Sequence, residues 1–306
     1  MYYSNESTVS EKDYSIFQPI DFPLINESWK PISLGENDLL KTIKRFILEK
    51  RLVQVKDIFN VKQGINSGNN NCFKIQKPEW QSLPINEQGF FRPVIDNKAI
   101  KNGQLFSSSY IWFPYNSSGI LLKTEEEFQL KAPAFFDKLF PFKNELASRG
   151  RKNESNWWYL SEHRNWLLKN EPRLYSTRFG NSTSFAFDES GMFVVENGGA
   201  WIPKKVFNDE DSFFFYLALF SSPFFDDLLS IYSRQLSGGS WYDLGKKYSQ
   251  EIPIPNAHLS DVKNSLGFAR LVEIGKELTQ GNTYSKMTSS QILRAFFILT
   301  PSVNLC

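Results

Sequence analysis

The residues best suited to chemistry lie between Val61 and Ile75, where glycines and asparagines separate two apolar runs. The segment contains Gly64, Asn66, Gly68, Asn69, Asn70 and Asn71. Glycine allows backbone conformations that β-branched residues resist, and asparagine is favoured in turns. The pattern predicts a polar loop that is held between pieces of core and contacts a partner.

Positive charge is concentrated between Lys138 and Arg178. This stretch has nine Lys and Arg against four Glu, whereas the whole chain has a net charge of only +2. Trp157, Trp158, Trp166 and Tyr175 are interleaved with the charges. The stretch is either a solvated face or a surface that neutralises nucleic-acid phosphates. Smaller basic pairs occur at Lys204-Lys205 and Lys246-Lys247.

Other chemistry has little support in the sequence. Cys72, Cys306, His163 and His258 are too dispersed for a zinc site, so we predict no metal. A nucleophile elbow, a phosphate-binding glycine loop and a dinucleotide fingerprint are all missing. A nuclease core needs Asp followed by Glu-x-Lys in a strand, and the nearest approaches, Asp96 with Lys98 and Glu273 with Lys276, have the wrong spacing or context. We therefore expect a binding protein rather than an enzyme.

The composition is that of an ordinary globular protein of one or two domains, with 306 residues of which 41% are hydrophobic and 16% aromatic. Two distant cysteines indicate a reducing compartment, and we expect the chain to be cytoplasmic. The N-terminus has no signal-peptide pattern, and no apolar run approaches about 18 residues. We expect no association with a membrane.

The N-terminal half predicts an arm, a helix and a sheet. Residues 1–35 are polar and proline-punctuated, and a helix is expected from an Asn37 cap to Lys50-Arg51. Short β-prone runs within 52–115, such as Cys72 to Ile75, predict sheet. Thr124 has capping-box spacing and is expected to open helical segments broken at Pro133 and Pro141.

The C-terminal half alternates again. Residues 157–206 read as sheet with a turn at Gly198-Gly199, followed by a buried helix at Phe213–Phe220 and a second from Ser222-Pro223 to about Arg234. The segment 251–255 must be extended, and helices are expected at 260–279 and 290–299. The predicted class is α+β, with a mixed, mainly antiparallel sheet and flanking helices.

Gly64-Ile65-Asn66-Ser67-Gly68-Asn69-Asn70-Asn71-Cys72-Phe73 resembles the signature that opens the target-recognition domain of TaqI-type adenine-specific DNA methyltransferases and related restriction-modification enzymes. Further similar motifs follow in the same order: Leu146-Ala147-Ser148-Arg149, Trp157-Trp158-Tyr159, Pro172-Arg173, Phe185-Ala186-Phe187-Asp188, Gly238-Gly239 and Ile252-Pro253-Ile254-Pro255. The resemblance covers about residues 50–256. It implies an arm and helix at 1–50, a recognition domain at 51–256 and a helical segment at 257–306.

The family's catalytic motif, Asn/Asp-Pro-Pro-Tyr/Phe, and its glycine-rich S-adenosylmethionine loop do not occur in this sequence. The resemblance therefore implies a non-catalytic specificity subunit or domain that binds double-stranded DNA, with S-adenosylmethionine held by a separate adenine methyltransferase subunit and no cofactor in this chain. Adenine methylation flips the base, while a separate surface reads the neighbouring bases.

The resemblance and the side-chain chemistry together give the candidate residues. Asn, Gln and Arg can bind adenine and guanine edges through paired hydrogen bonds, and Lys and Arg bind phosphates. The DNA-binding candidates are Gln63, Asn66, Ser67, Asn69, Asn70, Arg149, Arg151, Lys152, Arg173, Arg178, Lys246 and Lys247. Gly64, Gly68, Gly238 and Gly239 are expected to shape the loops.

Several alternatives stay open at this level. Asn70 either reads a base or bonds its own loop, and Trp241 and Tyr242 either contact DNA or pack. The helices at 37–50 and 260–299 either dock the catalytic partner or cover this chain's own sheet. The rival functions are a stand-alone DNA-binding or interaction protein and, less favoured, a nuclease.

Overall fold

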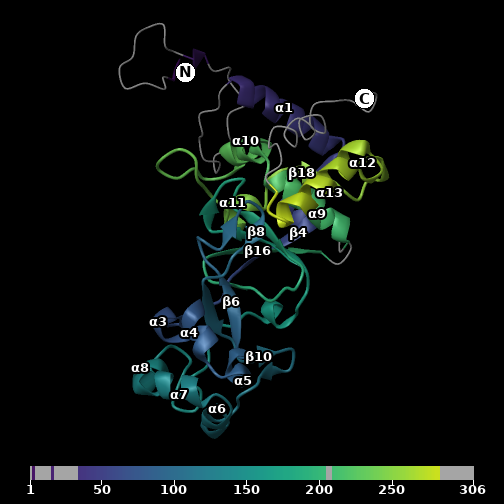
Figure 1. Ribbon diagram of the computed structural model, residues 1–306. Helices are drawn as coiled ribbons and strands as arrows, with labels where there is room; N and C mark the ends of the chain where they lie inside the picture. Colours follow the sequence, from purple (N-terminus) through teal and green to yellow (C-terminus); the bar gives the residue numbers. More distant parts are fainter. Residues whose placement is uncertain (1, 4–14, 17–33, 205–208, 283–306) are drawn as a thin grey trace.

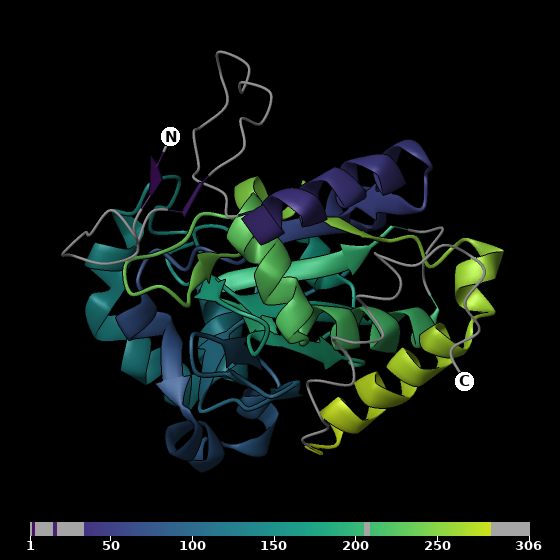
Figure 2. The ribbon, with the colours of Figure 1, turned by 90° about the horizontal axis from the view of Figure 1, so that it is seen from above.

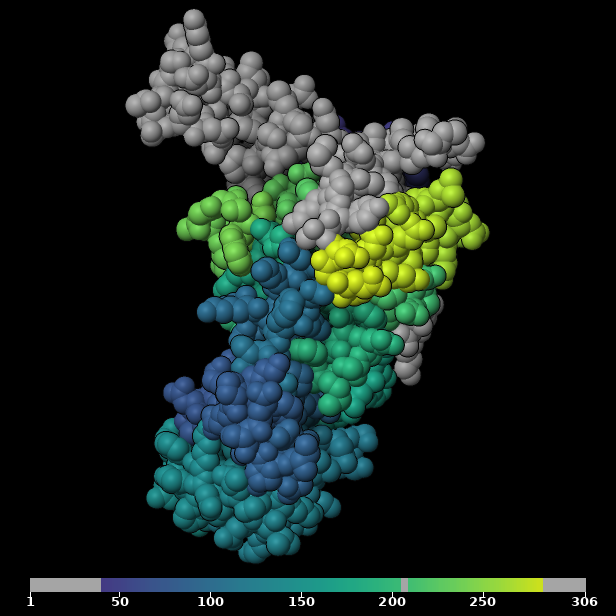
Figure 3. Space-filling model, in the orientation of Figure 1, coloured from purple at the N-terminus to yellow at the C-terminus, as the bar shows by residue number. Residues whose placement is uncertain are grey.

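The computed structural model describes residues 2–3, 15–16, 34–204 and 209–282. These residues form an α+β structure with two lobes, one above the other in Figure 1. The predicted helix at 290–299, most of the predicted arm, Lys205 and Cys306 lie outside the described residues. The space-filling view shows the lower lobe as a distinct mass (Figure 3).

The upper, large lobe is built on a four-stranded antiparallel sheet in the order β14-β12-β16-β4. These strands are β4 (Phe59–Gln63), β12 (Arg173–Thr177), β14 (Phe185–Asp188) and β16 (Gly198–Pro203). The helices α9 (Glu210–Phe220) and α10 (Pro223–Tyr232) pack against the sheet, and α13 (Leu266–Thr279) lies along α9 (Figure 2).

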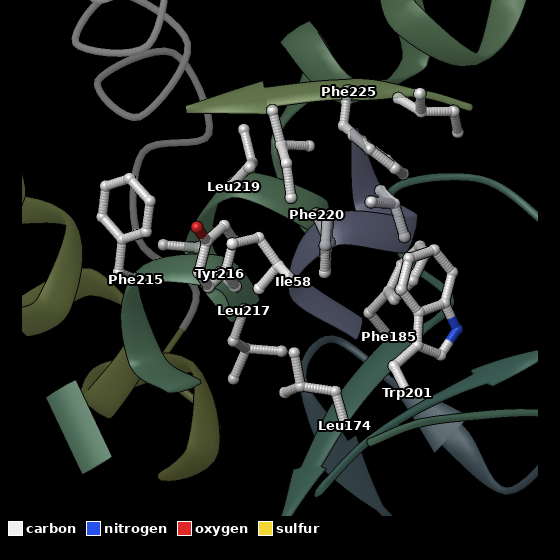
Figure 4. Packing of buried hydrophobic residues seen from close by; sticks show 14 of the residues in the cluster. Ile58, Leu174, Phe185, Trp201, Phe215, Tyr216, Leu217, Leu219, Phe220 and Phe225 are labelled. Atoms are coloured by element: carbon white, nitrogen blue, oxygen red, sulfur yellow. The ribbon is translucent and has the colours of Figure 1, made fainter. Parts of the chain in front are cut away.

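Aromatic rings fill the core of the large lobe. The side chains of Phe185, Phe220 and Trp201 face one another, with ring centroids 5.0–5.2 Å apart (Figure 4). Ring pairs at this spacing stabilise a core beyond the effect of the apolar area they bury. The Trp201 indole N–H donates to the Ser176 hydroxyl at 3.0 Å, so its one polar atom is also satisfied.

The lower, small lobe has a sheet in the order β15-β6-β9-β5, parallel between β15 and β6 and antiparallel elsewhere. Its strands are β5 (Lys74–Gln76), β6 (Phe91–Ile95), β9 (Ser109–Trp112) and β15 (Val194–Val195). Short helices surround it: α3 (Asn70–Phe73), α4 (Lys77–Ser82), α5 (Ile85–Gln88), α6 (Glu125–Lys131), α7 (Pro133–Leu139), η1 (Phe140–Phe142) and α8 (Lys143–Ala147). Trp112, Trp157 and Trp158 are fully buried in its core.

The remaining elements cover the edges and connect the lobes. They are β1 (Tyr2–Tyr3), β2 (Ser15–Ile16), α1 (Leu34–Leu48), β3 (Leu52–Gln54), α2 (Val55–Ile58), β7 (Ile100–Lys101), β8 (Gln104–Leu105), β10 (Tyr115–Asn116), β11 (Gly119–Ile120), η2 (Asn165–Leu168), β13 (Phe179–Gly180), β17 (Tyr242–Asp243), α11 (Lys246–Ser249), β18 (Pro253–Pro255) and α12 (Ser260–Lys263). A small cluster that includes Ile95, Tyr175 and Val195 joins the two cores.

The expected α+β class with mainly antiparallel sheet is confirmed, as are several local predictions. Thr124 caps α6 by accepting a hydrogen bond from the Glu127 N–H at 3.2 Å, and breaks fall near Pro133 and Pro141. Ser222 caps α10, with Pro223 in its first turn. The buried helix α9 and the extended segment at β18 also lie where they were expected.

Other local predictions are wrong, each for a physical reason. Asn37 lies inside α1 rather than at its cap. Cys72 and Phe73 are helical, because the Asn69 side chain caps α3. Gly198 lies in β16, where a Cβ would meet the Ser176 carbonyl oxygen at 2.2 Å, so this glycine permits close strand contact rather than a turn.

Several predicted segments have different boundaries or types. Trp157 to Tyr159 form a turn with buried tryptophans rather than a strand. The sheet region 52–115 contains short helices, and the helix predicted at 260–279 is divided into α12 and α13.

The packing also bears on the flanking helices. Ile43 and Phe46 of α1 and Phe268, Leu271 and Ile274 of α13 are buried in the large-lobe core. These apolar faces therefore cover this chain's own core, one of the two alternatives left open by the sequence. The predicted domain boundaries after residues 50 and 256 stay predictions, although one core runs across both.

In the described part of the chain, no single helix is long and apolar enough to cross a membrane. The pair α9 and α10 passes that test by length and composition, with a bend of 73° between the two helices. Most residues of α9 are buried in the large-lobe core, as is usual for the central helix of a packed lobe.

Candidate nucleic-acid interface

The segment Gly64–Phe73, called the entry loop here, carries the chain from the end of β4 into the small lobe. Gly64 is buried, and a Cβ there would lie 1.9 Å from the Val195 carbonyl oxygen. Gly68 has a φ of +80°, and a Cβ there would lie 2.1 Å from the Ser161 hydroxyl. Both glycines are therefore required by close contacts with distant parts of the chain, in addition to backbone freedom at Gly68.

The asparagines of the entry loop organise its backbone. The Asn66 side chain accepts a hydrogen bond from the Gly68 N–H at 3.0 Å. Asn69 caps α3 by accepting from the Cys72 N–H at 3.3 Å, and its amide donates to Glu145 at 2.6 Å. Together, these local bonds and the longer-range bond to Glu145 favour one conformation of the loop before any ligand binds.

Asn70 is exposed and has both ends of its amide engaged. Its Nδ2 donates to Glu196 at 2.5 Å, and its Oδ1 accepts from the buried hydroxyl of Ser67. Glu196 is in turn paired with Lys74, whose ammonium also lies 3.5 Å from Asp96. Because a carboxylate only accepts hydrogen bonds, Glu196 determines which end of the Asn70 amide faces it.

Arg149 ties the entry loop to the small lobe. Its guanidinium donates to the carbonyl oxygens of Leu146, Ser67, Trp157 and Tyr159, which uses four of its five N–H groups. The group also lies 4.8 Å from the centroid of the Phe73 ring, and burial lowers its pKa. Arg149 was predicted to contact DNA, but its bonds place it in the support of the loop.

Arg151 and Lys152 follow directly and are more accessible. Arg151 is exposed with a φ of +66°, which projects it from a tight turn. Lys152 is half-buried over the Tyr159 ring, and burial, with a smaller contribution from the Arg149 charge, lowers its pKa. Both positions allow contact with an anion.

Arg173 is a correction to the predicted interface. Its side chain is 1% exposed and donates to the carbonyl oxygens of Glu171 and Lys169, beside the Trp166 ring. A residue in the sheet interior cannot reach a base edge. The motif Pro172-Arg173 resembles the family's pattern. A short sequence motif does not indicate whether the Arg173 side chain faces solvent or the protein interior.

The remaining basic candidates lie in the large lobe. Arg178 shares the buried carboxylate of Asp243 with Arg234, at 3.2 Å from each guanidinium. Lys246 and Lys247 are exposed on α11. One carboxylate between two arginines leaves this patch positive.

The loop between α10 and β17 carries the other glycine pair. Gly238 and Gly239 have φ values of +105° and +88°, with open space where a Cβ would lie. The neighbouring Trp241 is 49% exposed, whereas Tyr242 is buried, so only the tryptophan can contact a partner.

Gln63, a predicted reader, is exposed at the end of β4. Residues that the sequence did not single out complete the site. The neighbouring Lys62 is also exposed. Glu162 exchanges backbone hydrogen bonds with Asn66 at 2.8 and 3.0 Å. Arg164 donates to the Gly64 carbonyl oxygen at 2.8 Å. Sequence spacing gives no signal for Glu162 and Arg164, because they lie about 100 residues from the loop in the chain.

The side chains around the entry loop also include possible metal ligands. Among residues 34–204 and 209–282, no group of three or more His, Cys, Asp or Glu side chains is placed to hold a metal ion. The surface combines an oriented amide, exposed cations and a rigid loop. These are the parts that recognition of a polyanion with readable polar edges requires.

No family model matches the chain, and no curated protein matches it. Among solved structures, the chain is similar to the Type IIL restriction-modification enzyme MmeI, which was solved in complex with DNA, with a TM-score of 0.45 and 13% sequence identity. The likeness covers 80% of this chain and 36% of that one, so the chain spans about a third of that protein's length.

Proposed function

We propose that this chain is a sequence-specific DNA-recognition module of an N6-adenine methyltransferase or restriction-modification system, acting with a separate catalytic methyltransferase chain. The observation that carries the proposal is Asn70, an exposed amide held in one orientation at a rigid loop. The motif order from Gly64 to Pro255 supports the same proposal.

The orientation of Asn70 suits adenine. With one Nδ2 hydrogen on Glu196 and one Oδ1 lone pair on Ser67, one donor and one acceptor of the amide are left. Adenine presents an N7 acceptor and an N6 donor in the major groove, and an asparagine amide matches that pair. A side chain that is already ordered loses less conformational entropy on binding.

The accessible cations supply affinity that does not depend on the DNA sequence. In this proposal Arg151, Lys152, Lys246 and Lys247 neutralise backbone phosphates, because each side chain is at least partly accessible to solvent. In this proposal the catalytic motif and S-adenosylmethionine belong to the partner chain, because the sequence carries no Asn/Asp-Pro-Pro-Tyr/Phe motif.

The test is binding to a randomised set of duplexes, with and without the partner methyltransferase. Asn70→Ala is expected to lower the discrimination between adenine and other bases by about 1–3 kcal/mol at one position. Glu196→Gln should give a smaller loss, because the amide stays but its orientation is no longer set. Asn264→Ala, at an exposed asparagine on the end of α12, is the matched control.

Two outcomes would contradict the proposal. One is equal binding to all sequences by the wild-type chain together with its partner. The other is a loss in Asn70→Ala that is the same for every sequence, since it would indicate a phosphate contact alone.

A nuclease is the second candidate, and one observation favours it. Lys74 lies against the carboxylates of Asp96 and Glu196, which is the combination of two acids and a lysine that a nuclease core needs, although it does not have the expected sequence spacing. Cleavage of plasmid DNA by the purified chain with magnesium, lost in Asp96→Asn, would favour this function over recognition alone.

A further inference from the structure

A hollow of about 620 Å³ lies beside the entry loop. One wall is the segment from Tyr159 to Trp166, and another includes Lys62 from β4 of the large lobe. Hollows of this size are typical of sites for small organic ligands. Two backbone hydrogen bonds between Glu162 and Asn66 connect the segment from Tyr159 to Trp166 to the entry loop.

The charge of the hollow is positive. Its single carboxylate, Glu162, is paired with Arg164, which also donates to the Gly64 carbonyl oxygen. Lys62 and Lys152 both line the hollow, and the described part of the structure contains no ion pair for either. Two ammonium groups without a counter-charge favour an anion, and phosphate is the anion that lysine commonly binds as a point charge.

The hollow also has flat aromatic surfaces. Tyr159 and Trp166 line it, and both are only half-buried. The His163 ring is stacked on Tyr115, with centroids 4.5 Å apart and planes within 12°. Aromatic side chains beside basic groups are the combination by which proteins hold an unpaired base and its phosphate.

We propose that this hollow binds one nucleotide unit, with the phosphate on Lys62 and Lys152 and the base against the rings of Tyr159 and Trp166. Asn70 does not line the hollow, although Lys152 is shared with the proposed duplex surface. Binding of a nucleotide in the hollow does not require that the chain recognises a duplex sequence. The nucleotide is either a free mononucleotide or one unit of an unpaired DNA strand. Both sources present a base and an anionic phosphate group to the hollow.

Calorimetric titration of the full chain, together with fluorescence of the 2-aminopurine duplex, distinguishes the two sources. The probes are dAMP, inorganic phosphate, a short single-stranded oligonucleotide and a duplex with one unpaired 2-aminopurine. Binding of dAMP on its own would identify a free nucleotide as a ligand. Binding of the strand and the 2-aminopurine duplex that is weakened by Tyr159→Leu, with a change in 2-aminopurine fluorescence and without dAMP binding, would identify a nucleic-acid unit.

Variants separate the phosphate and base contacts. The double variant Lys62→Ala/Lys152→Ala is expected to weaken nucleotide binding by about tenfold or more, as for the loss of a hydrogen bond to a charged group. Tyr159→Leu is expected to weaken nucleotide binding by about tenfold, because base stacking is lost. Lys44→Ala, at an exposed lysine of α1, should bind as the wild type.

The proposal is overturned if none of the nucleotide probes binds, or if the double lysine variant binds them as the wild type does. It is also overturned if inorganic phosphate binds as tightly as the nucleotide, since the rings would then have no part. Circular dichroism of each variant establishes that it is folded, and the lysine pair keeps the test valid if Tyr159→Leu is unstable.

Discussion

Gly64 and Gly68 stand where neighbouring atoms leave no room for a side chain, whereas Gly238 and Gly239 face open space. The entry loop is held from outside, by Arg149, by Glu162 and by the carbonyl oxygen of Val195. The Gly238 loop, residues 234–241, is held mainly by its own backbone, through bonds such as the Leu236 N–H to the Trp241 carbonyl oxygen at 2.8 Å.

The difference separates two uses of glycine that a sequence pattern does not distinguish. In the entry loop glycine allows close packing between segments that are distant in the chain, which makes the loop rigid and suits it to orienting Asn70. In the Gly238 loop glycine only provides positive φ angles. A loop held by few distant contacts is expected to open more easily and to adapt to a partner.

The comparison predicts the largest effect for Arg149→Met. The change removes four charged hydrogen bonds and leaves buried carbonyl oxygens without partners, so the free energy of unfolding should fall by about 3 kcal/mol. Chemical denaturation measures the change. Arg151→Met, at the exposed neighbour, should cost less than about 0.5 kcal/mol. Equal effects would mean that Arg149 does not hold the loop.

Gly64→Ala should lower the free energy of unfolding by about 2 kcal/mol, because the new methyl group meets the Val195 backbone and the chain must shift. Gly150→Ala is the matched control, since nothing lies within 4 Å of a Cβ at that position. A stability unchanged from wild type would show that the backbone around Gly64 and Val195 can shift without cost.

Gly238→Ala is expected to cost only about 1 kcal/mol, because its φ of +105° is unfavourable for alanine but no atom obstructs the methyl group. Thermal unfolding under the conditions used for Gly64→Ala gives the direct comparison. A loss larger than that of Gly64→Ala would reverse the contrast between the two loops.

The smallest effect concerns pH and His163, beside the entry loop. Burial lowers the pKa of His163 from 6.5, and the Lys152 charge adds to this effect. Below pH 6.5 the unfolded chain therefore binds more protons than the folded chain, so the free energy of unfolding falls as the pH drops through this value.

His163→Phe keeps an aromatic ring against Tyr115 and removes the titratable imidazole. The stability lost between about pH 7.5 and pH 5.5 should be smaller in the variant than in the wild type, as measured by urea denaturation at each pH. Parallel pH profiles of the two proteins would contradict the lowered pKa.

Several features followed from sequence alone because they depend on residues a few positions apart. The Thr124 and Ser222 caps are bonds across three residues, and the apolar run of α9 can only be buried. The polar character of the entry loop could also be predicted, because its polar residues are consecutive in the sequence. The same is true of the α+β class, which follows from the alternation of such segments.

Tertiary structure decided which of the candidate side chains is accessible. Arg173 and Arg178 are five residues apart in one basic stretch, yet the first is interior and the second lies at the surface beside Asp243. Asn70 meets Glu196 across 126 residues, and Arg149 meets Ser67 across 82. Local sequence contains no information on such pairs, because their members are distant in the chain and come into contact only when the whole chain folds.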